Sequence, residues 1–121
     1  MDFVGDGSGV GVSAAARAIL EGCTFSNWRT GVLAYGEAWV NVADCAFTGN
    51  EVGFHFNSAG EAVIGDVYRD NLFTGNTTAI LLERVSSNIT LDLSGCRFSD
   101  NGTDIDNRCD QPLNLTRAIF E

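Results

Sequence analysis

The sequence predicts an all-β solenoid of about five coils with three short strands in each coil, and three observations support this prediction. Phenylalanine recurs at nearly constant spacing along the 121 residues. Pairs of apolar residues, two positions apart, flank these phenylalanines. Fourteen glycines against one proline, with frequent Asn and Asp, indicate many turns and few long helices. The length and apolar content suit one domain, residues 1–121.

The repeating phenylalanine defines one strand in each coil. Its six positions are Phe3, Phe25, Phe47, Phe73, Phe98 and Phe120, spaced 22, 22, 26, 25 and 22 residues apart. A unit of this length cannot close a core by itself, so neighbouring units must stack. Parallel strands lie about 4.8 Å apart, and equivalent rings are therefore expected to form one internal pile.

Two further strands follow from apolar pairs at fixed distances from the same anchor, because alternate side chains of a strand share one face. Seven and nine residues after the anchor lie Val10/Val12, Val32/Ala34, Phe54/Phe56, Ile80/Leu82 and Ile105/Asn107. Seven and five residues before it lie Ala18/Leu20, Val40/Val42, Leu91/Leu93 and Leu113/Leu115, with Asp66/Tyr68 as a break in the pattern. One run, Ser13 to Leu20, has a short helix-like pattern instead.

This repeat resembles the right-handed, single-stranded parallel β-helix of the pectate-lyase-like superfamily, and the resemblance covers essentially the whole chain. In that family an asparagine ladder lines one tight turn. The matching positions, three residues after the anchor, are Asp6, Asn50, Asn76 and Asn101, with Trp28 as an interruption. These side chains are expected to satisfy buried backbone groups at the corner.

Two other repeat or all-β architectures fit less well. A sandwich or up-and-down barrel would use antiparallel hairpins with two-residue turns such as Asn-Gly. Asn101-Gly102 is the one such dipeptide, and it falls in the ladder column. A leucine-rich repeat is disfavoured because its leucine consensus and helical periodicity are absent.

Charge limits the classes of partner. Sixteen acids against seven arginines, without lysine, give a formal charge of −9, which disfavours nucleic acid and anionic membrane surfaces. No run approaches the roughly 18 apolar residues of a membrane span, and the first residues lack the pattern of a secretion signal. The resemblance nonetheless implies an extracellular or cell-surface protein and a polysaccharide as partner.

The terminal anchors Phe3 and Phe120 occupy ordinary core positions, without an atypical polar cap. This pattern suggests a segment of a longer solenoid, and exposed strand edges favour end-to-end association into homo-oligomers. A monomer with frayed ends is the alternative.

His55, the single histidine, lies between Phe54 and Phe56, so its imidazole is expected to point outward. Its column contains Leu33 and Leu81 on neighbouring coils. Enzymes of the resembled superfamily gather acids, a basic residue and often histidine on one exposed sheet. A histidine between two leucines does not reproduce that cluster, and a surface role without catalysis is the favoured interpretation.

Asp44 and Asp70 share a column three residues before the anchor, with Arg69 beside them. Stacked carboxylates of this kind can bind Ca²⁺ or act as an acid and base couple. Gly22 and Gly95 occupy the flanking coils, however, and two carboxylates fall short of the six to eight oxygens that Ca²⁺ prefers. An ordinary turn with a surface ion pair is the simpler interpretation, and no cofactor is expected.

Cysteines and glycosylation motifs are interpreted as structural or incidental. Cys23, Cys45 and Cys96 share one column and are expected to be buried thiols, whereas Cys109 in a polar loop is expected to be the most exposed. Without a CxxC pair, zinc is disfavoured. Of the four N-x-S/T motifs, at Asn76, Asn88, Asn101 and Asn114, two fall in the ladder.

Three functions remain open at this stage. The first is a non-catalytic module for cell-surface structure, adhesion or carbohydrate recognition, with Trp28, Tyr35 and Trp39 as candidate sugar-stacking aromatics. The second is a polysaccharide-active lyase, glycosidase or epimerase, with Asp44, Asp70, Arg69 and His55 as candidate catalytic groups. The third is a self-assembling structural unit.

Overall fold

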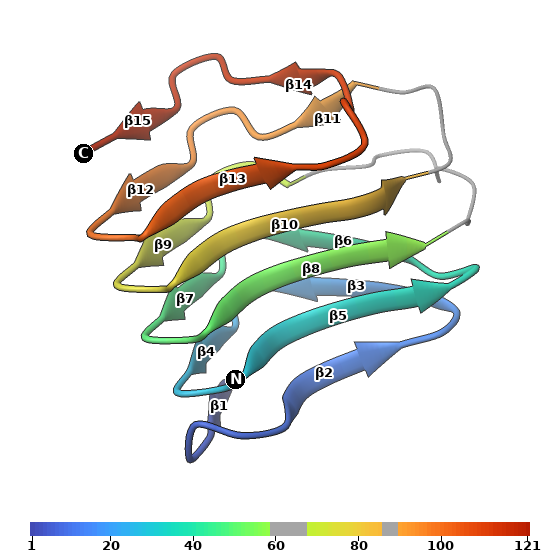
Figure 1. Cartoon of the computed structure of the whole chain (residues 1–121), viewed down its shortest axis with the longest axis vertical. Coiled ribbons are helices and arrows are strands. Elements are labelled where there is room, and N and C mark those ends of the chain that lie inside the picture. The colour runs from blue at the N-terminus through green and yellow to red at the C-terminus, as the bar shows by residue number, and fades with distance from the viewer. Residues whose placement is uncertain (59–67, 86–89) are drawn as a thin grey trace.

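A computed structural model describes residues 1–58, 68–85 and 90–121. The chain winds through successive coils whose strands pair in parallel with those of the next coil, so that three sides of β-structure enclose one core (Figure 1). The described residues contain no helix, and hence none long and apolar enough to cross a bilayer. The predicted solenoid of about five coils, with parallel pairing and not hairpins, is confirmed.

The first side is a six-stranded sheet of very short strands, which places the anchor phenylalanines in direct register. Its strands, in order, are β1 (Asp2–Val4), β4 (Thr24–Ser26), β7 (Ala46–Thr48), β9 (Leu72–Thr74), β12 (Arg97–Ser99) and β15 (Ile119–Phe120). The six rings form the expected continuous pile, with centroids 4.8 to 5.1 Å apart and planes within 13° of parallel. The four inner rings are 0–1% exposed, which makes this pile the axis of the core.

The second side is a five-stranded sheet of longer strands. These are β13 (Thr103–Asn107), β10 (Thr78–Val85), β8 (Val52–Ser58), β5 (Thr30–Gly36) and β2 (Val10–Ala14). Phe54 and Phe56 point into the core, so the intervening residue of β8 points outward. The predicted register is correct from β5 to β13 but wrong for β2, where Val12 and not Val10 pairs with Val32. The turn before β2, with Gly7 and Gly9 at positive φ, holds two more residues than its counterparts.

The third side consists of two pairs of strands in the described residues. These are β3 (Arg17–Glu21) with β6 (Trp39–Ala43), and β11 (Leu91–Asp92) with β14 (Leu113–Asn114). The helix-like interpretation of Ser13 to Leu20 is therefore wrong, because inter-coil pairing with β5 and β6 outweighs a weak local helical preference. Of the predicted break, Asp66 lies outside the described residues, whereas Tyr68 is 3% exposed and fills the core against Phe54.

Two columns of left-handed residues make the corners on either side of the six-stranded sheet. Three residues before the anchor, all five described positions have φ between 52° and 72°: Gly22, Asp44, Asp70, Gly95 and Arg117. Two residues after the anchor the same conformation recurs at Asn27, Gly49, Gly75 and Asp100. Gly, Asn and Asp are the residues that adopt this conformation most readily, which explains their recurrence.

The asparagine ladder forms at the second corner as predicted. Asn50 Oδ1 accepts the backbone N–H of Trp28, Asn76 Oδ1 that of Asn50, and Asn101 Oδ1 that of Asn76, each at 2.9 Å. In the same order their Nδ2 groups donate to the anchor carbonyls of Phe25, Phe47 and Phe73 at 2.9 to 3.0 Å. Each rung thus satisfies two backbone groups of the preceding coil.

The first two positions of the ladder differ from the pattern. Trp28 Nε1 donates to Phe3 O at 3.0 Å, so the indole makes the bond that an asparagine amide makes in later coils. Asp6 was expected to be a rung but is exposed and accepts hydrogen bonds from the N–H and hydroxyl of Ser8. These bonds hold the pKa of Asp6 below its usual value. Asp6 lies in the longer first turn, which moves it away from the ladder.

The cysteine predictions are confirmed: Cys23, Cys45 and Cys96 are buried free thiols, and Cys109 is partly exposed. Burial raises the pKa of the Cys45 and Cys96 thiols to about 11 in each case. Asn71, which interrupts this column, accepts the N–H of Cys45 and donates to Val42 O. A buried asparagine therefore supports the opposite corner as well.

Candidate functional site

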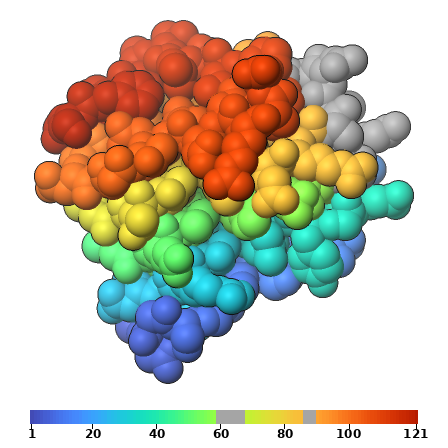
Figure 2. All heavy atoms as spheres, in the orientation of Figure 1, coloured from blue at the N-terminus to red at the C-terminus, as the bar shows by residue number. Residues whose placement is uncertain are grey.

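The outer face of the five-stranded sheet carries apolar, aromatic, amide and ionisable side chains. Leu33, His55 and Leu81 lie side by side on β5, β8 and β10, on the side of the sheet away from the core; Leu33 and His55 are partly exposed, and Leu81 is 8% exposed. Figure 2 shows the coils succeeding one another as layers across this side of the molecule. Because strands repeat about every 4.8 Å, these side chains form a ladder across the strands.

A hydrogen bond between two side chains extends this row. His55 Nε2 lies 2.9 Å from Glu83 Oε1, and the two side chains are 20% and 42% exposed. The register between β8 and β10 shifts between Leu82 and Arg84, so Glu83 has no residue opposite it on β8. Such a bulge changes the direction of side chains, and here both Glu83 and Arg84 are exposed. Glu83 stands two residues after Leu81 and shares its outward face, where its carboxylate meets the imidazole.

Tyr35 and Asn57 form the next row on the same face. They are paired across β5 and β8, two residues beyond Leu33 and His55, and so share their side of the sheet. Tyr35 is 43% exposed. The outer-face patch, defined here as Leu33, Tyr35, His55, Asn57, Leu81 and Glu83, combines an aromatic ring, an apolar base, an amide and the hydrogen-bonded imidazole and carboxylate.

The stacked acids lie elsewhere. Asp44 and Asp70 belong to the left-handed corner before the six-stranded sheet, and His55 lies in the middle of the next side of the coil. The backbone N–H of Asp44 donates to Arg69 O, and that of Asp70 donates to Ser94 O. Both backbone groups thus contribute to the stacking of the corner, and the three-residue strands separate this corner from His55.

The Asp70 carboxylate has a structural place at this corner. A β-carbon added at Gly95 would come within 2.2 Å of Asp70 Oδ1, so the carboxylate occupies the space above the glycine of the following coil. Asp44 belongs to the preceding coil, on the other side of Asp70. No three His, Cys, Asp or Glu side chains of the described residues gather closely enough to hold a metal ion.

Of the three candidate sugar-stacking aromatics, Tyr35 alone is well exposed. Trp39, named as a candidate for sugar stacking, is 1% exposed and packed edge-on against Phe56 at 5.1 Å. It begins β6 directly after a tight turn, and the aromatic core beside it gives the indole more apolar contact than solvent would. Trp28 is partly buried and held by Phe3 O.

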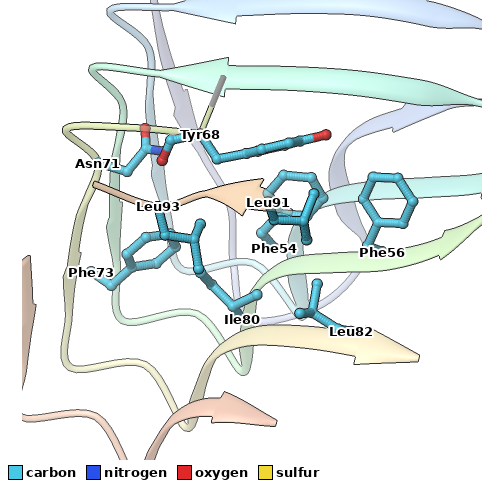
Figure 3. Close-up of a pocket in the computed structure, with 9 residues that line it drawn as sticks. All are labelled: Phe54, Phe56, Tyr68, Asn71, Phe73, Ile80, Leu82, Leu91 and Leu93. Carbon is cyan, nitrogen blue, oxygen red and sulfur yellow. The ribbon is translucent and has the colours of Figure 1, made fainter. Parts of the chain in front are cut away.

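A small cavity inside the coil does not form a second site. It offers about 10 Å³, roughly the room of one water molecule, between core side chains such as Phe54, Ile80 and Leu91 (Figure 3). Its lining is almost entirely apolar. The gap is a consequence of packing phenylalanine against smaller aliphatic residues in neighbouring coils.

The comparisons with known proteins agree with this architecture. The family described as "Right handed beta helix region" matches residues 2–116. The chain belongs to this family. The right-handed β-helix predicted from the repeat is thus confirmed, while the searches of curated proteins and of solved structures gave no match. Membership of this β-helix family fixes the architecture, and the function has to be argued from the surface.

Sequence reasoning placed His55 correctly but missed its partner. Glu83 lies 28 residues away in the sequence, on the neighbouring strand, two residues after Leu81, which pairs with His55. Asn57 could have been found, since it stands two residues after His55 and shares its outward face. The spacing of outward residues along β8 was the available signal.

Proposed function

We propose that this chain is a non-catalytic β-helix module that binds an extended carbohydrate on its outer-face patch, as part of a cell-surface or adhesive protein. The observation that supports it is the juxtaposition of exposed Tyr35 with Asn57 and the His55–Glu83 pair on one face. An aromatic ring can stack on the apolar face of a sugar, and the polar groups can bond its hydroxyls.

The net charge of −9 indicates which carbohydrate suits this patch. A negatively charged surface repels an acidic polymer, so a neutral polysaccharide is the expected ligand. The patch extends over three neighbouring strands, β5, β8 and β10, which fits an elongated ligand better than a single sugar.

The alternative of a polysaccharide-active enzyme requires Asp44, Asp70, Arg69 and His55 to act in one groove. Their positions on different sides of the coil, with Asp70 packed above Gly95, favour the binding role. Catalytic acid and base groups must both reach the scissile bond, and groups on separate sides of the coil do not meet this requirement.

Affinity electrophoresis in gels containing a neutral glucan, a neutral mannan or polygalacturonate would test the proposal. We expect retardation by a neutral polymer and a loss of affinity of about 3- to 10-fold in Tyr35→Ala, the value of one aromatic stacking contact. Leu72→Ala is the matched control, because Leu72 is 41% exposed but lies on the six-stranded sheet.

Equal binding by both variants, or no retardation by any polymer, would contradict this function. The same incubations are assayed for unsaturated products and new reducing ends. Their release by the wild type, and its loss in Asp70→Asn, would establish the enzymatic alternative instead.

A further inference from the structure

Three N-x-S/T motifs lie in the described residues, and the fold treats them very differently. They begin at Asn76, Asn101 and Asn114, whereas the fourth, at Asn88, lies outside the described residues. N-glycosylation uses the side-chain amide nitrogen of the asparagine as the nucleophile. An asparagine can serve in the folded protein only where this nitrogen reaches the surface and is not held in the core.

The first two motifs belong to the ladder. Asn76 is 2% exposed, its Nδ2 donates to Phe47 O at 2.9 Å, and its Oδ1 accepts the N–H of Asn50. Asn101 Nδ2 likewise donates to Phe73 O at 3.0 Å and its Oδ1 accepts the N–H of Asn76. A glycan on either nitrogen would break a rung and would have to pass through the corner of the coil.

The third motif is open to solvent over its whole length. Asn114, Leu115 and Thr116 are all exposed, at the end of β14. Asn114 Oδ1 accepts the Thr116 hydroxyl at 2.6 Å and the Thr116 N–H at 3.1 Å, which holds the two recognised side chains together. The Nδ2 group makes one long contact of 3.4 Å with Asp92 Oδ1, itself on the surface.

We propose that Asn114 is an N-glycan acceptor of the folded protein, with a polyprenyl-pyrophosphate-linked oligosaccharide as donor. Asn114 Nδ2 forms a bond to C1 of the first sugar while the bond between C1 and the pyrophosphate oxygen breaks. The electron pair leaves with the polyprenyl pyrophosphate, and the amide nitrogen loses one proton. This inference goes beyond the proposed carbohydrate binding, because Asn114 lies on a different side of the coil from the outer-face patch.

The test uses the folded chain carrying Asn88→Gln, which removes the motif outside the described residues. An oligosaccharyltransferase is selected that glycosylates peptides 74–80, 99–105 and 112–118 to similar extents. With the folded chain we expect one added glycan by intact mass, located at Asn114 by peptide mapping. Adding either Asn114→Gln or Thr116→Ala to this chain should abolish the glycan.

Two outcomes would overturn the inference: an unmodified folded chain under conditions that modify peptide 112–118, or a glycan on folded Asn76 or Asn101. Circular dichroism of each variant shows whether it is folded. Neither outcome depends on polysaccharide binding, which is measured separately on the unglycosylated chain.

Discussion

The corner that holds the asparagine ladder and the outer face of the five-stranded sheet are built from the same coils, yet they follow different rules. At the corner, Asn50, Asn76 and Asn101 repeat one geometry, with all three rung distances at 2.9 Å. On the outer face, the equivalent column changes from leucine to histidine and back to leucine, and the register itself shifts at Glu83.

The difference follows from access to water. A backbone group enclosed at the corner has to find a partner within the protein, and the same side chain solves this problem in each coil. An outward side chain has water as an alternative partner, so each coil can carry a different residue at little cost in stability. Repetition therefore marks the structural side, and variation marks the side where a specific ligand can be recognised.

The largest expected effect comes from the centre of the phenylalanine pile. Phe73 is 1% exposed and stacks on Phe47 at 4.8 Å and on Phe98 at 5.1 Å. Phe73→Ala should lower the free energy of unfolding by about 3–5 kcal/mol, through lost burial and the cavity left behind. Urea unfolding followed by circular dichroism measures this change.

The matched control is the neighbouring Leu72→Ala, because Leu72 is apolar, 41% exposed and on the outer side of the same strand. We expect a loss of about 1 kcal/mol or less for this variant. Equal losses at the two positions would show that the pile does not carry the stability of the coil.

The loss of a ladder side chain should have the second-largest effect on the free energy of unfolding. Asn76→Ala leaves the N–H of Asn50 and the carbonyl of Phe47 without their side-chain partners in an enclosed corner. Each unsatisfied buried group costs about 1–3 kcal/mol, so a total loss of about 2–4 kcal/mol is expected, measured as for the phenylalanine. Asn57→Ala on the outer face should stay within about 0.5 kcal/mol of the wild type, and a loss as large as that of Asn76→Ala would remove the distinction between the two regions.

Substitutions of a packed glycine and of a glycine at an open corner should also differ in their effect on the free energy of unfolding. Gly53 packs under the pile, where an added β-carbon would come within 2.5 Å of the backbone oxygen of Ala79. Gly53→Ala should therefore cost about 1–3 kcal/mol through forced shifts of the backbone. Gly75→Asn should be nearly neutral, because its φ of 68° suits asparagine, Asn27 holds the equivalent place, and no atom lies within 4 Å of the added carbon. The reverse ranking in urea unfolding would contradict this.

The sequence predicted the inside of this protein much better than its outside. The anchor spacing and the alternation of apolar residues were sufficient for the pile, the buried thiols and the outward direction of His55, because each follows from the position of one residue relative to one anchor. The ladder was predicted from the resemblance to the β-helix family, and its asparagines stand at one fixed distance from the anchor. The register of β2 failed because the spacing from Phe3 is not conserved through the longer first turn.

The remaining errors concern features that depend on two separate segments. The burial of Trp39 depends on Phe56 in the following coil, and the His55–Glu83 pair depends on the register between two neighbouring strands. The positive φ shared by Gly22, Asp44 and Asp70 agrees with the turn that the sequence favoured for these two acids, since these residue types tolerate that conformation.

The reactivity of the cysteine thiols gives the smallest expected effect, because it distinguishes buried from exposed positions without destabilising the coil. The thiolate is the reactive form, and a pKa of about 11 in place of about 9 lowers its fraction near pH 8 roughly 100-fold for Cys45 and Cys96. Burial slows reagent access further. With a disulfide reagent at pH 8, Cys109 should react first, and Cys109→Ser should remove this fast phase. A fast phase that persists in Cys109→Ser would contradict the assignment of inside and outside.

The same thiols predict how stability changes in alkaline solution. Their folded pKa lies above the unfolded value, so the folded state binds these protons more tightly than the unfolded state does. Their favourable contribution is complete below about pH 9 and is lost as the pH rises toward 11. Urea unfolding at pH 8, 9.5 and 11 should show this decline, and it should be smaller in Cys45→Ala and Cys96→Ala, which lack the ionising group. An unchanged decline in both variants would assign the alkaline transition to other groups and separate it from the packed interior of the coil.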